Sequence, residues 1–148
     1  MPKIDIAAAP IRRGSSYPAP FDAPVAARTA HRLGDAVGLT QFGVSLVRLP
    51  AGAWSSQRHW HHKEDELVWI VEGELVMVTD AGEETLRAGD CAGFKAGVRD
   101  GHHFQNRSGR DAAFLVVGTR VADDSGEYSD IDMTFTPEGF FHKDGRPY

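Results

Sequence analysis

Short runs of hydrophobic residues, separated by polar turn signals, fill the middle of the chain. The runs cover residues 42–49, 66–71, 74–79, 83–87, 91–94 and 112–119. Pro50-Ala51-Gly52, Asp80-Ala81-Gly82 and Ala88-Gly89-Asp90 interrupt them with residues that favour turns. Many short strands at such close spacing are typical of an antiparallel barrel or sandwich. The pattern therefore predicts an all-β protein.

Two local signals refine this all-β prediction. Residues 66–71 run into Glu72-Gly73, and the next run begins at once with Glu74. Because glycine readily adopts the backbone conformation of a tight turn, we expect a β-hairpin that bends at Gly73. Residues 23–32 carry the only helical pattern in the sequence, and we expect a short helix there.

The chain divides into three parts by composition. Residues 1–28 hold prolines at positions 2, 10, 18, 20 and 24, which predicts an extended N-terminal arm. Residues 29–120 contain the strand runs and form the predicted barrel domain. Residues 121–148 have a looser pattern, with apolar side chains such as Phe135 and Phe140. We expect this C-terminal extension to pack on the barrel or on a neighbouring subunit.

Composition and charge exclude several classes of function. A chain of 148 residues with 41% hydrophobic and 25% charged residues is ordinary for one globular domain. The net charge of −5 argues against a nucleic-acid partner, and no apolar run is long enough for a membrane helix. The first ten residues hold an acid and two prolines, unlike a secretion signal. Cys91 is the only cysteine, so the chain cannot form an internal disulfide and we expect a cytoplasmic protein. We expect the thiol of Cys91 itself to be buried.

Histidines form the first group of residues with chemical potential, within residues 58–66. Side chains two apart on a strand point to the same face, so His59 and His61 would aim both imidazoles at one point. Glu66 opens the next strand after a short turn, and Trp60 should face away into the core. Two imidazoles and a carboxylate are suitable ligands for Mn, Fe, Ni or Zn. A solvated histidine-rich loop would have the same composition, so this group alone does not decide.

A second pair of histidines, His102 and His103, follows one strand-turn-strand unit later. A barrel would bring this segment back beside the first group. On spacing alone either histidine is a candidate ligand, because the two side chains would point to opposite faces of a strand. Phe104 and Asn106 share the face of His102. We expect Phe104 to line a pocket and Asn106 to fix the backbone at the turn that follows.

The two histidine segments resemble the two sequence motifs of the cupin family. The spacing His59-x-His61, four residues, Glu66, six residues, Gly73 fits the first motif, H-x-H-x(4)-E-x(6)-G. The residues that fit the second motif are Gly89, Ala96, Gly97, His102 and Asn106. Lys95 stands where that motif usually has proline, and the loop before the histidine is two residues longer than usual.

The resemblance implies a jelly-roll barrel, or double-stranded β-helix, of two antiparallel sheets with a metal inside one end. Carried over by position, the metal ligands are His59, His61, Glu66 and His102, with His103 outside the set. The implied cofactor is one divalent transition metal, either Mn, Fe, Zn or Ni. The resemblance also implies a homodimer, in which the two subunits could exchange their N-terminal arms. Trp69, among apolar neighbours, is expected in the core or in an interface.

The resemblance leaves two classes of function open. The first is a metal-dependent enzyme, an isomerase, lyase or dioxygenase, acting on a small polar substrate that is a carbonyl, sugar-like or phenolic compound. Small cupins described as sugar phosphate isomerase-like are similar overall. The second class is a non-catalytic module that binds or senses a small molecule through the metal. The candidates for the substrate pocket are Gln57, Phe104, Lys95 and Arg99. The candidates for a general base are Glu72, His103 and Lys95.

Overall fold

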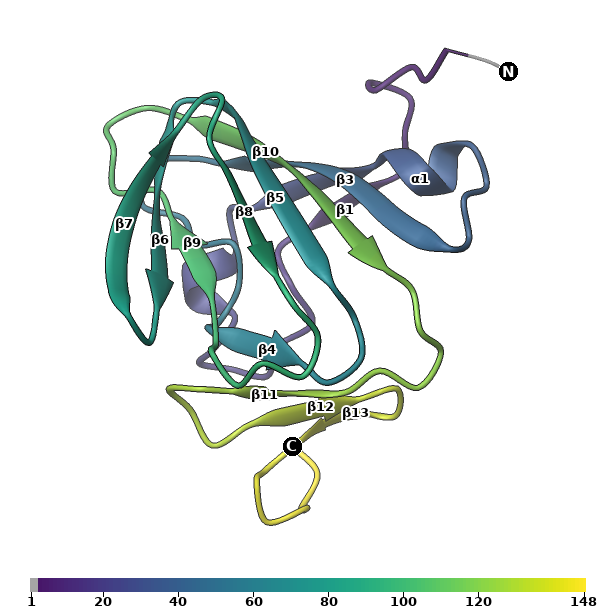
Figure 1. Cartoon of the computed structure of the whole chain (residues 1–148), viewed down its shortest axis with the longest axis vertical. Helices are drawn as coiled ribbons and strands as arrows, with labels where there is room; N and C mark the ends of the chain where they lie inside the picture. Colours follow the sequence, from purple (N-terminus) through teal and green to yellow (C-terminus); the bar gives the residue numbers. More distant parts are fainter. Residues whose placement is uncertain (1–2) are drawn as a thin grey trace.

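The computed structural model describes residues 3–148, in which the regular secondary structure consists almost entirely of β-strands (Figure 1). The largest sheet contains, in spatial order, β1 (Ile11–Arg13), β2 (Thr29–Arg32), β3 (Phe42–Leu49), β10 (Ala112–Thr119), β5 (Glu66–Glu72) and β8 (Cys91–Phe94). Every neighbouring pair in this sheet is antiparallel. Met1 and Pro2, which begin the predicted N-terminal arm, lie outside the described residues.

Two smaller sheets complete the barrel. The first contains β7 (Gly82–Arg87), β6 (Glu74–Thr79) and β9 (His103–Gln105), and the second contains β13 (Gly139–Phe141), β12 (Thr134–Thr136), β11 (Gly126–Tyr128) and β4 (His59–His61). An antiparallel bridge between His59 and His102 connects the two. The four-stranded sheet lies across one end of the barrel (Figure 1). These layers confirm the predicted all-β jelly-roll fold.

The hydrophobic core lies between the large sheet and the sheet of β6, β7 and β9. On β3, Val47 and Leu49 are fully buried whereas Arg48 between them is exposed, as expected of a strand with one face inward. Phe114 of β10 and Phe104 of β9 meet from opposite layers, with ring centroids 5.6 Å apart. Burial of these side chains is the main force that holds the two layers together.

The chain bends sharply at Gly73, but the bend does not form a hairpin. The φ of Gly73 is 75°, and a Cβ atom placed there would lie 3.0 Å from the Cβ of Ala112. The position therefore favours glycine. The strands on either side belong to different sheets, because β5 pairs with β8 and β10 whereas β6 pairs with β7 and β9. The hairpin predicted at Gly73 is wrong, since the chain crosses there from one layer to the other.

Helical structure in residues 3–148 is limited to two single turns. They are the 3-10 helix η1 (Ala23–Val25) and the α-helix α1 (Leu33–Ala36). The helix predicted for residues 23–32 is therefore wrong beyond its first turn. Its second half forms β2, which hydrogen-bonds to β1 on one side and β3 on the other. Pairing with distant strands outweighs a weak local helical preference. None of the described helices has the length and apolar character needed to span a membrane.

Both terminal parts of the chain lie against the barrel. The N-terminal part supplies β1, which extends the large sheet by pairing with β2. The C-terminal part supplies β11, β12 and β13, and β11 pairs with β4 so that Gly126 lies opposite His61. A Cβ atom on Gly126 would clash with the Trp60 carbonyl oxygen and with the ring of Phe135, so this pairing requires glycine. The C-terminal strands thus adjoin the strand that carries the first two histidines.

Cys91 and Trp69 are both exposed on the outer face of the large sheet. They lie opposite each other on β8 and β5. The predicted burial of Cys91 is wrong, because β8 is the edge strand of its sheet and its outer face has no cover within one chain. Trp69 is 52% exposed and therefore does not belong to the core of the chain. Its place in an interface stays a prediction.

Candidate metal centre

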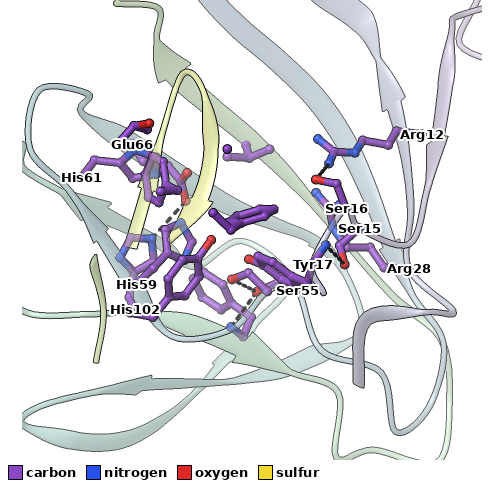
Figure 2. Close-up of a pocket in the computed structure, with 18 of the residues that line it drawn as sticks. Arg12, Ser15, Ser16, Tyr17, Arg28, Ser55, His59, His61, Glu66 and His102 are labelled. Carbon is purple, nitrogen blue, oxygen red and sulfur yellow. Dashed lines mark hydrogen bonds and ion pairs between the residues drawn. The ribbon is translucent and has the colours of Figure 1, made fainter. Parts of the chain in front are cut away.

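Three segments of the chain bring the four predicted ligands to one end of the barrel. β4 turns His59 and His61 to one face and buries Trp60 on the other, as strand alternation requires. His59 and His102 are paired neighbours, and each backbone N–H donates to the other's carbonyl oxygen, at 3.2 and 2.9 Å. Glu66 is the first residue of β5. Figure 2 shows the four side chains together at one side of a cavity.

The rings of His59, His61 and His102 lie close to one another and to the Glu66 carboxylate. The His59 ring centroid is 5.0 Å from that of His61 and 5.4 Å from that of His102. Nε2 of His102 lies 3.2 Å from Oε1 of Glu66. Phe94 stacks flat on His102, with centroids 3.4 Å apart and an interplanar angle of 5°. Nδ1 of His102 is buried without a hydrogen-bond partner among the described residues, so the stack and Glu66 orient this ring.

Hydrogen bonds define which nitrogen of His59 and of His61 carries the proton. Nδ1 of His59 lies 2.9 Å from the carbonyl oxygen of Gln57, and Nδ1 of His61 lies 2.6 Å from Oδ2 of Asp124. A carbonyl or carboxylate oxygen only accepts, so Nδ1 is the donor in both rings. The lone pair is then on Nε2. This arrangement of an acceptor behind the ring is the usual support of a metal-binding histidine.

The protonation states of His59 and Glu66 suit metal binding. Burial, together with the neighbouring His102 and His61, lowers the pKa of His59 to about 3, so the ring is neutral at physiological pH. Burial acts to raise the pKa of Glu66, but the hydrogen bond with His102 and the electrostatic interactions with the three surrounding imidazole rings outweigh burial, so the pKa is lowered. A neutral imidazole and an ionised carboxylate are the forms that bind a divalent transition metal. The donor set therefore fits such an ion.

A different cluster has the tightest grouping of possible ligand atoms. Among residues 3–148, His61, Glu64 and Asp124 form the one group of three whose donor atoms all lie within 4.8 Å of one another. The four predicted ligands line a common cavity, and although His102 lies 3.2 Å from Glu66, no three of the four bring their donor atoms within 4.8 Å of one another. The two acids of the tight cluster already accept backbone N–H groups, Glu64 from Val121 and Asp124 from Lys63. We therefore infer that Glu64 and Asp124 fix the loops and that Asp124 also orients His61.

A cavity of about 530 Å³ opens beside the four predicted ligands. Phe104, Phe114 and Val116 provide its apolar wall. The N-terminal part of the chain lines it with Arg12, Ser15, Ser16, Tyr17 and Arg28, and the C-terminal part with Tyr128, Phe135, Thr136, Gly139 and Phe140. Both terminal segments are therefore part of the cavity, and the volume suits a small molecule.

A second cavity of about 220 Å³ lies on the other side of the ligand cluster. His61, Glu66 and His102 line both cavities. Lys95 and Asp100 line only the smaller one. The candidate metal centre thus forms part of the wall between the two spaces.

The four residues predicted for the substrate pocket lie in different places. Phe104 lines the large cavity and Lys95 the small one. Gln57 is buried, and its Nε2 donates to the carbonyl oxygen of Phe21 at 2.7 Å. Arg99 is exposed and lies over the ring of Trp60, 5.6 Å from its centroid. The lining of neither cavity includes Gln57 or Arg99.

His102 and His103 point in different directions. His102 faces Glu66, whereas Nδ1 of His103 donates to the carbonyl oxygen of Ser56 at 3.0 Å. Nε2 of His103 lies 2.9 Å from Nε2 of Gln105, outside both cavities. The geometry therefore favours His102 over His103 as the fourth ligand. Glu72, another candidate base, pairs with Arg48 away from the cavities.

The sequence did not point to several residues of the site. Asp124 supports His61 only because β11 pairs with β4, and nothing in the local sequence indicates that pairing. Arg12, Tyr17 and Arg28 come from a proline-rich segment without periodicity, so their place in the cavity wall could not be inferred. An interrupted strand pattern gives no signal for the direction of a side chain.

Comparison with known families supports the fold. A family model described as Cupin domain matches residues 45–118, which include all four predicted ligands. None of the curated proteins matches the chain.

Three solved structures illustrate the likeness. A crystal structure of a sugar phosphate isomerase from a cupin superfamily, from Silicibacter pomeroyi, is 49% identical over 99% of this chain and 96% of that one, with a TM-score of 0.95. A candidate sugar phosphate isomerase from Acidithiobacillus ferrooxidans is 27% identical over 77% of this chain and 74% of that one, with a TM-score of 0.72. A polyketide cyclase from Streptomyces resistomycificus, 18% identical over 80% of this chain and 79% of that one, shares the fold with a TM-score of 0.61.

Proposed function

The chain belongs to the cupin family, and we propose that it is a metal-dependent enzyme acting on a small polar substrate. His59, His61, Glu66 and His102 would hold one divalent transition metal, either Mn, Fe, Zn or Ni. The observation that carries the proposal is the position of these three imidazoles and one ionised carboxylate on the wall of a single cavity of about 530 Å³. Nitrogen and carboxylate oxygen ligands accept each of these metals.

The chain's own residues would bind and orient the substrate. When bound, the metal would act as a Lewis acid that polarises a substrate oxygen. Burial raises the pKa of Tyr17 and of Tyr128, so both hydroxyl groups stay protonated near neutral pH and can donate hydrogen bonds. Their rings meet edge to face at 5.5 Å, and the Tyr128 ring lies 5.6 Å from that of His59. Phe104 and Phe114 would exclude water from the reacting atoms.

A sugar-like substrate and an isomerase reaction are the assignments we favour. The 49% identical protein from Silicibacter pomeroyi is a sugar phosphate isomerase, and it matches almost the whole of this chain. Serine hydroxyl groups of Ser15, Ser16, Ser55 and Ser56 line the cavity, and hydroxyl groups of this kind suit a polyhydroxy compound. Lyase and dioxygenase chemistry use the same fold and are outcomes of the test.

We also propose that the chain forms a homodimer through the outer face of the large sheet. Two cross-strand rows of that face are apolar: Leu46, Leu115 and Trp69 in one, and Val44, Val117 and Leu67 in the other. Trp69 is 52% and Leu67 46% exposed in the single chain. The solvent face of an antiparallel sheet is normally polar, so a contiguous apolar face is typical of a protein interface. A second copy of the chain is the occupant that we propose.

The test of the proposed function separates an enzyme from a binding module. Protein freed of metal would be reloaded with Mn or Fe and incubated with small aldoses, ketoses and their phosphates. Metal-dependent conversion of one of these compounds that is lost in Glu66→Gln supports the enzyme. Tight binding of a compound without conversion, in protein that holds its metal, would replace the enzyme with a metal-containing binding module.

A further inference from the structure

Two arginines line the main cavity at the side away from the histidines. Arg12 lies on β1 and Arg28 just before β2, and both belong to the cavity lining. Figure 2 shows them on one side, the His59 and His102 cluster on the other, and Tyr17 between. A molecule that fills the cavity would therefore meet the candidate metal centre at one end and two guanidinium groups at the other.

The guanidinium group of Arg28 is poorly satisfied by the protein itself. Its Nε is buried and has no hydrogen-bond partner among residues 3–148, and Nη1 donates only a long bond of 3.3 Å to the carbonyl oxygen of Gly14. Burial, followed by repulsion from Arg12, lowers the pKa of Arg28. A desolvated cation beside a second cation is unfavourable unless an anion accompanies them.

Within the described residues, no acid forms an ion pair with Arg12 or Arg28, and Glu66, which lines the same cavity, acts on Arg28 only through its charge. The ion pairs of the described chain involve other arginines, lysines and histidines, and neither Arg12 nor Arg28 takes part in one. Arg12 instead donates from Nη2 to the hydroxyl oxygen of Ser16 at 3.1 Å. In a chain with a net charge of −5, two cations on one cavity wall without an ion-pair partner are a specific feature rather than a general excess of positive charge.

We propose that Arg12 and Arg28, with Ser15 and Ser16, form a phosphate subsite, and that the substrate is a small phosphomonoester. The phosphate would lie between the guanidinium groups, and the polyhydroxy part would extend past Tyr17 toward His59 and Glu66. This inference rests on the proposed function, which places the reacting atoms of the substrate at the metal centre. Binding of the phosphate group between the two arginines does not require the metal.

Phosphate suits these donors better than a carboxylate does. A phosphomonoester carries between one and two negative charges near neutral pH and three terminal oxygens, so it can accept bonds from both guanidinium groups and a hydroxyl at once. Arginine forks also match phosphate oxygens in pairs. A carboxylate has one charge and two oxygens, which would leave part of this donor set unpaired.

The decisive experiment measures binding to the full chain by calorimetry, in the presence of a chelator. Ribose 5-phosphate, ribose, inorganic phosphate and gluconate are the probes. The variants are Arg12→Gln and its neighbour Arg13→Gln, since Arg13 is exposed on the same strand but does not line the cavity. Arg28→Lys is a third variant, which keeps the charge of this half-buried residue but removes the guanidinium fork.

We expect ribose 5-phosphate and inorganic phosphate to bind and ribose to bind at least about tenfold more weakly than its phosphate ester, because charge-assisted bonds are lost. Arg12→Gln and Arg28→Lys should weaken binding of both phosphates about tenfold, and Arg13→Gln should leave it unchanged. Equal binding of ribose and ribose 5-phosphate would overturn the proposal, as would equal effects of Arg12→Gln and Arg13→Gln. Binding of gluconate as tight as that of ribose 5-phosphate would overturn the phosphate assignment.

These outcomes are independent of the metal. Phosphate binding by chelated protein supports the subsite even where the metal-dependent reaction fails. Absence of phosphate binding overturns the subsite. It does not bear on the proposed metal centre, which is tested separately by metal content and by metal-dependent conversion of the substrate.

Discussion

Nδ1 of His61 lies 2.6 Å from Oδ2 of Asp124. This hydrogen bond joins β4 to the loop that precedes β11. The same carboxylate accepts the backbone N–H of Lys63 through its other oxygen, at 2.9 Å. Asp124 is therefore held in place by the main chain while it orients the imidazole. A carboxylate in this position also makes the opposite nitrogen of the ring a better ligand.

Replacing Asp124 should weaken metal binding without removing a ligand. In Asp124→Asn the side chain keeps its size but loses the charge that favours Nδ1–H as the donor. We expect affinity for Mn or Zn to fall about 10- to 100-fold. Competition with a chromophoric chelator measures this change. Asp123→Asn is the matched control, because Asp123 pairs with Lys63 at the surface and should leave the affinity unchanged. Equal losses in the two variants would contradict the orienting role of Asp124.

Asn106 fixes the backbone at the end of β9, as the sequence predicted. Its Nδ2 donates to the carbonyl oxygens of Leu49 and Arg110 at 2.7 and 2.8 Å, and its Oδ1 accepts from the N–H of Ser108 at 3.0 Å. The side chain is fully buried. Asn106→Ala should therefore lower the free energy of unfolding by about 2–4 kcal/mol, measured by urea denaturation. Ser108→Ala removes fewer bonds near the surface and should cost only about 1 kcal/mol. A loss under 1 kcal/mol in Asn106→Ala would refute this role.

The stability of the metal-free protein should fall in mild acid because of His59. Burial lowers the pKa of this ring from its ordinary 6.5 to about 3. Between these values the unfolded chain binds a proton that the folded protein does not, so stability is complete above pH 6.5 and declines as the pH falls toward 3. We expect the chelated protein to lose about 1–2 kcal/mol through this group between pH 7.5 and pH 5.

Two variants assign that acid sensitivity. His59→Gln should remove this part of the decline, and His62→Gln should retain it, because the His62 side chain is 37% exposed. Denaturation with urea at both pH values measures the difference. A decline of the same size in His59→Gln as in the native sequence would show that another group is responsible.

The apolar outer face of the large sheet predicts the effect of a charge at Trp69. Trp69→Lys would place an ammonium group within the proposed dimer interface, where it cannot be solvated. We expect the native chain to be a dimer in light scattering and Trp69→Lys to be a monomer. Val98→Lys replaces another exposed apolar residue, in the loop after β8, and should stay dimeric. A monomeric native chain would contradict the interface.

Local patterns predicted the fold class and the convergence of the two histidine segments. Strand alternation and turn spacing are properties of neighbouring residues, so the shared face of His59 and His61 could be inferred directly. The same reasoning could not tell that Gly73 carries the chain between sheets, because a run of apolar residues does not reveal which strands it will pair with. Cys91 was misplaced for the same reason, since edge and central strands have similar local sequences.

The cavity residues outside the motifs depend on long-range pairing. Arg12 reaches the cavity because β1 pairs with β2, and Tyr128 reaches it because β11 pairs with β4. Neither pairing leaves a signal in the segment itself. Sequence motifs therefore indicated the candidate metal ligands, whereas the opposite end of the cavity could only be described from the structure.

The metal content of purified protein tests the central claim most directly. Elemental analysis should find about one transition metal per chain in the native sequence, and much less in His59→Ala, Glu66→Ala and His102→Ala. His103→Ala should keep its metal, because that side chain faces Ser56 rather than Glu66. Full metal in both His59→Ala and Glu66→Ala, or loss of metal in His103→Ala with retention in His102→Ala, would contradict the ligand set.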